Sequence, residues 1–255
     1  MLTRVSIEPD TRAPTGQTNA YLLGETDGML VDPAVRDPGL DAAVERHDPA
    51  HVAVTHHHPD HVGAVADYAA EYDLTVWCRR GRAGDFESAA GISPDRTFAP
   101  GDPISALDGI EVLDTPGHAP EHVAYVAADG LVTGDLATAE GSVVVGAPEG
   151  DLRAYLSSLR RVHAMEPDRL YPGHGPVVDD PRATARRLIA HRLDREAQVL
   201  AAVLAGHRDL DAVVDAAYDK DVSHVRDLAT ATVAAHLEKL DVEGRIEWDS
   251  ELARF

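Results

Sequence analysis

A histidine-rich turn, Thr55-His56-His57-His58-Pro59-Asp60-His61, lies between an apolar run and a helical pattern. The run before it, residues 51–54, is typical of a short buried strand, and residues 62–72 after it have helical spacing. On extended backbone the first and third histidines point the same way, whereas the aspartate and the last histidine point elsewhere as the helix begins. Imidazole nitrogens and carboxylate oxygens are the usual ligands of zinc and similar divalent ions. The turn therefore predicts two adjacent ligand sets and two metals, the alternative being a polar loop that is merely rich in histidine.

Three later strand ends carry ligand-type residues. His118 follows the predicted strand 110–114, Asp135 follows 131–133, and His174 follows 169–171. Each stands beside a glycine, which permits the tight turn and close approach that a metal cluster requires. Any one of them alone would be an ordinary turn, but together they predict that four strand ends deliver ligands to one edge of a strand-rich core.

The remaining pattern mixes strands and helices. Residues 81–103 lack clear periodicity and predict an irregular surface with one short helix. Two hairpins are expected, around Gly24–Gly28 and around Asp129-Gly130. The further predicted strands are 2–7, 19–23, 29–32, 75–78 and 123–127, and the further predicted helices are 38–47 and 152–165.

The character of the chain changes after residue 180. Three helical patterns, 183–205, 210–218 and 225–240, are followed by a turn and a strand in 243–248. Three helices with a terminal β element form the winged-helix pattern. We therefore predict an α/β domain over residues 1–180 and a small helical, winged-helix-like domain over 181–255.

Arginines gather at the start of this second part, a local reversal of sign in an acidic chain. They predict contacts with substrate phosphates. The alternative is a solvated helix face in which they pair with Asp194, Glu196 or acidic groups of the core. The residues concerned are Arg182, Arg186, Arg187, Arg192 and Arg195, with His191 beside them, and we select Arg186, Arg187, Arg192 and Arg195 as candidate substrate contacts.

The composition is strongly acidic. The formal net charge is −21, from 44 acidic and 23 basic residues, and only Lys220 and Lys239 are lysines. Excess acid with scarce lysine favours a high-salt cytoplasm, where it keeps the surface hydrated; the alternative is a surface aimed at a basic partner. Because the Debye length is roughly 3 Å at molar salt, this charge argues only weakly against a nucleic-acid substrate.

Features that the sequence lacks indicate its cellular compartment and argue against membrane contact. No apolar stretch is long enough to span a bilayer, and residues 1–16 lack the apolar centre of a signal peptide. Cys78 is the single cysteine, which excludes an intrachain disulfide and a multi-cysteine zinc site. We expect a cytoplasmic protein without membrane contact.

The turn and the three strand ends together resemble the metallo-β-lactamase superfamily over residues 1 to about 180. The resemblance implies a four-layer αβ/βα sandwich with two metals at one edge of the facing sheets. It implies that the metals are two Zn²⁺, with iron or manganese as alternatives. Carried over by position, His56, His58 and His118 hold the first metal, Asp60, His61 and His174 hold the second, and Asp135 bridges them.

The resemblance also implies the chemistry. Two metals about 3.5–4 Å apart acidify a shared water that attacks a carbonyl carbon or a phosphorus. Asp60 would orient that water as well as bind metal. His122, four residues after His118, would either stand behind the ligands or protonate a leaving group, unless it is a plain surface histidine at a strand start.

The tail resembles that of the lactamase-beta-like 2 family, in which a compact winged helix follows the metallo-β-lactamase core. This resemblance rests on Tyr171–Pro176, on 191–196 and on 235–240. It implies a nuclease acting on single-stranded RNA or DNA. Two alternatives remain: a thioesterase of the glyoxalase II type acting on a small thioester, and a DNA-binding regulator with a non-catalytic core, against which the intact ligand set argues.

Overall fold

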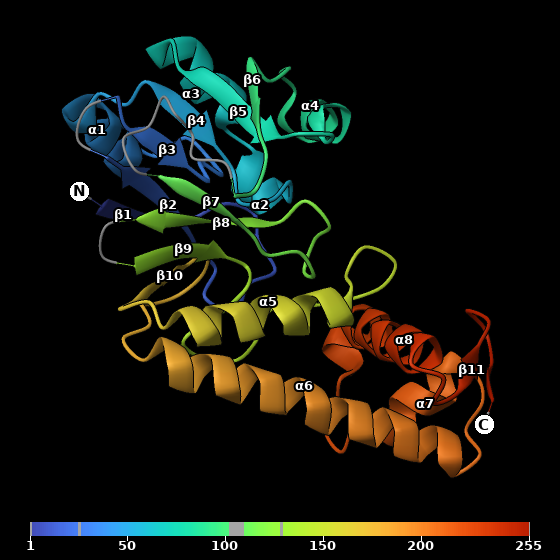
Figure 1. The fold of residues 1–255 in the computed structure, drawn as a ribbon. Coiled ribbons are helices and arrows are strands. Elements are labelled where there is room, and N and C mark those ends of the chain that lie inside the picture. The colour runs from blue at the N-terminus through green and yellow to red at the C-terminus, as the bar shows by residue number, and fades with distance from the viewer. Residues whose placement is uncertain (1, 25–26, 102–109, 128–129, 255) are drawn as a thin grey trace.

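The structure is a computed structural model that describes residues 2–24, 27–101, 110–127 and 130–254. The turns expected around Gly24–Gly28 and Asp129-Gly130, and the end of the irregular stretch 81–103, fall partly outside these residues. Two facing sheets form the centre, and helices cover the outer face of each (Figure 1). The four-layer α/β arrangement expected of a metallo-β-lactamase sandwich is therefore confirmed.

The first sheet has six strands in the order β1-β2-β3-β4-β5-β6. The first three strands pair antiparallel and the rest pair parallel, each new strand being added beside the previous one. The strands are β1 (Leu2–Ile7), β2 (Thr18–Leu23), β3 (Met29–Val31), β4 (His51–Ala53), β5 (Thr75–Arg79) and β6 (Arg96–Phe98).

The second sheet has four strands in the order β10-β9-β8-β7. Only β10 and β9 run parallel, so β7, β8 and β9 form a meander to which a distant strand is added. The strands are β7 (Glu111–Asp114), β8 (Val123–Ala127), β9 (Gly130–Gly134) and β10 (Leu170–Pro172).

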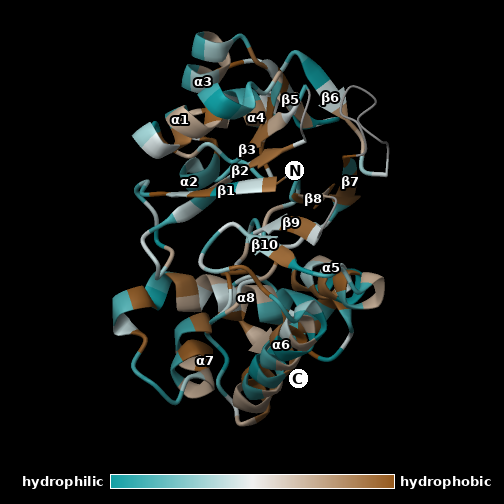
Figure 2. Ribbon diagram, turned by 90° about the vertical axis from the view of Figure 1, so that its left-hand side faces the viewer, coloured by the Kyte–Doolittle hydropathy of each residue, from teal (hydrophilic) through white to brown (hydrophobic). Residues whose placement is uncertain are grey.

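Alternation along the strands builds the layers. In β2, Ala20 and Leu22 pack under helices, whereas Tyr21 and Leu23 face the other sheet. Successive strand side chains point to opposite faces, so each sheet is apolar on both sides. Inner strands such as β3 are accordingly brown in Figure 2, whereas the edge strands β1 and β6 are partly teal and the outer helices mix teal with brown. The first sheet is covered by α1 (Pro38–His47), α3 (Val65–Tyr72) and α4 (Ala83–Ala90), and the second by α5 (Leu152–Met165) and α6 (Pro181–Leu204).

Two elements differ from the prediction. The helix expected over 62–72 is divided into α2 (Pro59–Val62) and α3, because Ala64 N–H donates to Pro33 O instead of continuing the helix. The region 81–103 contains α4, as expected, and also the strand β6, which pairs with β5 at the sheet edge. No helix in the described ranges is apolar enough over a sufficient length to cross a bilayer.

The carboxy-terminal region has the predicted helices and a two-stranded sheet rather than one strand. The end of the long helix α6 and the elements after it pack around a separate apolar cluster that includes Val199, Val233 and Leu240. The first half of α6 packs instead against the α/β sandwich, since Leu188 contacts the cluster formed by the second sheet and α5. The 180/181 boundary and the winged-helix assignment stay predictions. After α6 the elements are α7 (Leu210–Ala217), the 3₁₀ turn η1 (Ser223–Val225), α8 (Arg226–Val242), β11 (Glu247–Trp248) and β12 (Ala253–Arg254).

Candidate metal centre

The ends of four strands meet at one edge of the sandwich. The histidine-rich turn follows β4 and runs into α2, and three loops follow β7, β9 and β10. Together they gather all seven predicted ligands, in groups whose candidate ligand atoms lie within 4.8 Å of one another. These residues are His56, His58, Asp60, His61, His118, Asp135 and His174.

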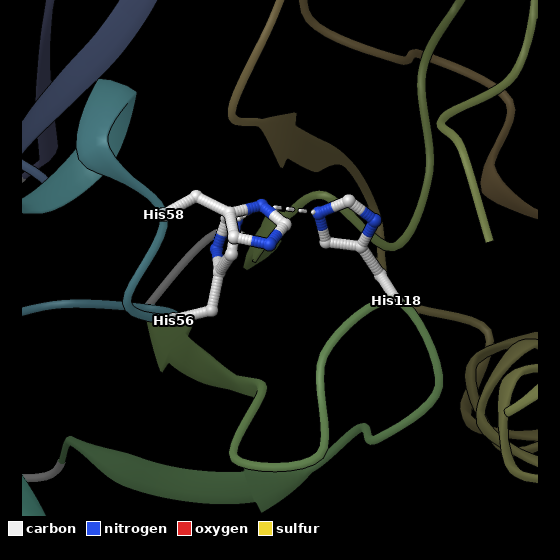
Figure 3. A group of neighbouring side chains, drawn as sticks. All are labelled: His56, His58 and His118. Carbon is white, nitrogen blue, oxygen red and sulfur yellow. Dashed lines mark hydrogen bonds between the residues drawn. The ribbon is translucent and has the colours of Figure 1, made fainter. Parts of the chain in front are cut away.

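The first group consists of three imidazoles. His58 Nδ1 lies 3.0 Å from His56 Nε2 and 3.0 Å from His118 Nε2 (Figure 3). His58 therefore offers its δ nitrogen and the other two offer their ε nitrogens. This is the set predicted for the first metal.

The second group lies beside the first. His61 Nε2 is 3.3 Å from His174 Nε2, and His174 Nε2 is 3.7 Å from Asp60 Oδ2. Asp135 stands between the groups, with Oδ2 3.6 Å from His118 Nε2 and Oδ1 3.5 Å from His61 Nε2. The bridging position predicted for Asp135 is thus geometrically satisfied.

Two ligands of the first group direct their ring proton away from the centre. His118 Nδ1–H donates to Val144 O at 2.6 Å, so its Nε2 carries a lone pair. His58 Nε2–H donates to the Glu149 carboxylate at 3.1 Å, which leaves the lone pair on Nδ1. A carboxylate behind a ligating histidine fixes the tautomer and makes the ligand more basic.

A buried aspartate organises two further ligands. Asp32 accepts hydrogen bonds from Thr55 N at 2.7 Å, from Thr55 Oγ1 at 2.8 Å and from His61 Nδ1 at 3.0 Å. Because the Thr55 hydroxyl gives its proton to Asp32, it accepts from His56 Nδ1–H at 3.0 Å. The Nε2 lone pairs of His56 and His61 consequently face the centre.

The fifth imidazole completes the pattern. His174 Nδ1–H donates to Gln17 O at 2.7 Å. Asp135 Oδ1 is buried and has no hydrogen-bond partner within the described part of the chain. Five inward-facing ring nitrogens and two carboxylates therefore converge, an arrangement that a cation would stabilise. The donor set fits a dinuclear metal site.

The charges at the centre agree with this fit. Burial lowers the pKa of His61, but the charges of Asp32 and Asp135 outweigh it and raise the pKa to about 9. Burial raises the pKa of Asp135, and His61 and His174 outweigh that effect, so the pKa of this carboxyl lies well below its usual range. The centre thus holds fixed negative charge that attracts positive charge.

His122 supports the ligands and cannot protonate a leaving group. The ring is fully buried, Nδ1–H donates to Thr115 Oγ1 at 2.9 Å, and Nε2 accepts from Asp135 N–H at 3.1 Å. Both nitrogens are engaged and none faces the cavity. The predictions of a proton donor and of a surface histidine are corrected, and its role is to hold the backbone of Asp135.

A cavity of about 950 Å³ opens beside the ligands. One wall is the amino-terminal loop 10–15, in which Thr11 Oγ1 donates to Asp60 Oδ2. A second wall is the loop 138–146, and a third is α8 through Leu228 and Ala231. The carboxy-terminal region therefore forms part of the site.

Four arginines of the cluster are engaged within the chain itself. Arg187 and Arg192 donate to backbone carbonyls of the loop after β9, and Arg195 donates to Ala217 O and stacks on a tyrosine. Arg182, at the start of α6, pairs with Glu166 at the end of the neighbouring α5. None of these arginines is among the residues that line the cavity, so the geometry gives no support to them as substrate contacts, and that role stays a prediction.

Arg186 is exposed on α6 and likewise lies outside the cavity lining. Its role as a substrate contact stays a prediction. The local excess of positive charge seen in the sequence has a structural explanation for part of the cluster. Arg187 and Arg192 donate hydrogen bonds to backbone carbonyls of a surface loop.

Several residues that hold the ligands were missed by sequence reasoning. Asp32 follows a buried strand directly and has a left-handed backbone, with φ of 56°, a signal that only the structure provides. Glu121 is 6% exposed and accepts from His57 N–H at 3.0 Å, which ties down the histidine-rich turn. Glu149 and Thr11 lie on loops without a distinctive sequence pattern.

The chain matches the model of the Metallo-beta-lactamase superfamily over residues 13–174. The chain belongs to this superfamily. Superfamily membership together with the His/Asp cluster indicates a metal-dependent hydrolase.

Three similar proteins illustrate the range of the match. Beta-lactamase-like protein 2 homolog of Drosophila melanogaster is 31% identical over 90% of this chain and 84% of its own length. Thioesterase pkgB of Emericella nidulans is 31% identical over 74% of this chain and 55% of its own. A metallo-beta-lactamase family protein from Thermus thermophilus superposes over 100% of this chain and 98% of its own with a TM-score of 0.78 at 23% identity, a likeness of fold.

Proposed function

We propose that the protein hydrolyses an acyl thioester at a dinuclear zinc centre. The observation that carries the proposal is the lining of the cavity. Its carboxylates include Asp10, Glu140 and Glu149, and the apolar side chains of α8 close one side. Among the described lining residues the one arginine is Arg12, which is paired with Asp227 at 3.0 Å. Such a wall suits an uncharged acyl group better than a polyanion.

The chain's own residues provide the arrangement for hydrolysis. Metals bound at the two ligand groups would supply Lewis-acid chemistry, acidifying a water and polarising the oxygen of the substrate. Asp60 borders the cavity, and the Thr11 hydroxyl holds one of its oxygens. Asp60 orients the attacking water, whose oxygen bonds to the acyl carbon as the carbon–sulfur bond breaks. The leaving thiolate takes up the released proton.

Zinc is proposed because imidazole nitrogens form the larger part of the ligand set, five of seven residues. Zinc accepts nitrogen and oxygen donors at low coordination number. Iron and manganese accept the same donors and remain the alternatives. Elemental analysis of the purified protein, with reconstitution by each metal in turn, distinguishes the three.

A screen of acyl-thiol substrates tests the proposal. We expect the zinc-loaded protein, in concentrated KCl, to hydrolyse acyl-N-acetylcysteamine compounds, which carry no phosphate, and Asp60→Ala to lose at least about 100-fold in kcat. Asp60→Asn keeps the shape and serves as the matched variant. Absence of turnover over a range of acyl lengths, or turnover undiminished in Asp60→Ala, would overturn the proposal.

A nuclease acting on single-stranded RNA or DNA is the second candidate. It is favoured by the similarity to beta-lactamase-like protein 2 homologs, which extends over 90% of the chain and so includes the carboxy-terminal helices. The lining of the cavity disfavours it, because phosphates would meet carboxylates and no free arginine among the described lining residues. Labelled single strands belong in the same screen, and Asp60-dependent cleavage without thioester turnover would select the nuclease.

A further inference from the structure

The loop after β9 is held by one guanidinium at three points. Arg187, on α6, donates to Gly141 O at 2.7 Å, to Thr138 O at 2.7 Å and to Ala139 O at 3.1 Å. Only the planar fork of an arginine reaches several acceptors at once in fixed directions, and lysine offers a single point charge instead. The contact fixes the first half of the loop to α6.

The second half of the loop is held from α6 and from α8. Arg192 is 3% exposed and donates to Val143 O, with its guanidinium 5.2 Å from the ring centre of Tyr155. Ala147 N–H donates to Ala231 O of α8 at 3.0 Å. A Cβ on Gly146 would lie 2.7 Å from Ala231 Cβ, so the loop and α8 are in close contact here.

This loop holds a metal ligand. Val144 O, one residue after the carbonyl that Arg192 holds, accepts from His118 Nδ1–H at 2.6 Å. That bond keeps the Nε2 lone pair of His118 directed at His58 and Asp135. A continuous series of contacts therefore runs from α6, through the loop, to the first metal group.

We propose that Arg187 and Arg192 are positioning residues of the metal centre, acting on His118 through the loop 138–147. Both donate to backbone carbonyls of the loop, and neither is among the residues that line the cavity. The carboxy-terminal helices then have a function in metal binding that is separate from the wall they give to the cavity. The proposal rests on the metal centre and not on the identity of the substrate, so its test uses metal binding as the readout.

Arg187→Ala tests the proposal with a close control. Arg187 is exposed on α6, so its loss should leave the metal-free fold intact, and Arg186→Ala removes a neighbouring exposed arginine of the same helix. Competition with a chromophoric chelator gives the zinc affinity of each variant. We expect Arg187→Ala to bind the zinc of the first group about 10-fold less tightly, the lower end of what loss of a group behind a ligand costs, and Arg186→Ala to match the unaltered protein.

Cobalt substitution separates positioning from general stability. Absorption of bound Co²⁺ reports the geometry of its ligands, so we expect its visible bands to shift in Arg187→Ala and not in Arg186→Ala. Arg187→Lys keeps the charge and the stem but not the fork, so partial recovery of affinity is expected. Arg192→Met tests the second contact in the same two measurements.

The contrary outcome is equally clear. Zinc affinity and cobalt spectrum in Arg187→Ala equal to those of Arg186→Ala would overturn the proposal. If Arg187→Ala lowers the thermal unfolding temperature of the metal-free protein, Arg187→Lys decides by the same measurements. An unaltered spectrum in that folded variant, with full zinc affinity, would refute the positioning role. Neither result depends on whether the substrate is a thioester.

Discussion

At the scale of single residues, the metal centre depends on which nitrogen of each histidine carries the proton. His118 and His174 give theirs to backbone carbonyls, and His58 and His61 give theirs to carboxylates. Each outward bond leaves one lone pair facing inward. The ligands are therefore oriented before any cation arrives, which reduces the reorganisation that binding requires.

Gly173 permits the close approach of the second group. A Cβ at this position would lie 2.5 Å from Asp135 Oδ1 and 2.7 Å from His61 Cε1. We predict that Gly173→Ala displaces both ligands, so that metal analysis finds fewer than two ions per chain, at a cost of about 1–3 kcal/mol in stability from overpacking.

The control for Gly173→Ala is Gly84→Ala. Gly84 lies in α4, and a Cβ there meets open space. It should keep the full metal content and gain about 0.5–1 kcal/mol in stability, because alanine favours the helix. A full metal content in Gly173→Ala would show that the ligands can move aside without loss.

The ligands were predictable from sequence because each follows a strand in a pattern that the chain repeats. The residues behind them were not predictable in this way. Asp32 precedes a proline at a strand end, and Glu149 lies in a loop, positions where most carboxylates are only parts of turns. Their partners are 23 and 91 residues away, a separation that no local pattern reports.

At the scale of elements, α6 and α8 combine an apolar contact with a buried polar layer. Lys239 Nζ lies 2.7 Å from Glu196 Oε2, and both residues are at most 9% exposed. His236 is fully buried in the same layer, and neither ring nitrogen has a hydrogen-bond partner in the described ranges. An unpaired buried imidazole is stable only while it is neutral.

His236 predicts a dependence of stability on pH. Burial, followed by the charges of Arg192, Arg195, Lys239 and His191, lowers the pKa of His236 to about 3. The unfolded chain, with an ordinary histidine pKa of about 6.5, takes up a proton that the folded chain does not. Stability is therefore lost as the pH falls from about 6.5 toward 3, by up to ~1.4 kcal/mol per pH unit from this residue.

Denaturant unfolding of the metal-free protein at several pH values tests this. His236→Phe should show an acid limb that is shallower by one proton, while the other histidines contribute equally to both proteins. Equal slopes would mean that His236 is protonated, or hydrated, in the folded state.

The type and order of most helices and strands could be predicted from the sequence. What each face of a helix packs against could not. Helical spacing located α6, but whether its arginines face solvent, substrate or the chain depends on what packs against it. Loop carbonyls of residues 138–143 occupy those guanidinium groups. The same limit applies to β6, whose three residues gain their strand conformation from pairing with β5.

At the scale of the whole molecule, the charge is the dominant feature. A net charge of −21 opposes compaction, and the ion pairs on the surface, such as Arg12 with Asp227, are exposed and individually weak. Acidic residues also line the cavity, so dissolved cations are concentrated where the ligands lie. Salt should therefore influence both folding and metal binding.

We predict that KCl stabilises the protein mainly by screening its own repulsion. The Debye length falls from about 10 Å at 0.1 M to about 3 Å at 1 M, so the gain should be steep up to about 1 M and small above it. Each kcal/mol recovered should raise the unfolding temperature by roughly 2–4 °C for a chain of this size.

Exclusion of solute from the surface would instead give a steady rise, as sucrose does without screening any charge. Calorimetry of the metal-free protein in KCl and in sucrose separates the two curves. The prediction fails if the unfolding temperature does not change with KCl, or if it rises with KCl as steadily as it does with sucrose. Screening would then not stabilise the fold, and the acidic surface would be better explained by binding to a basic partner.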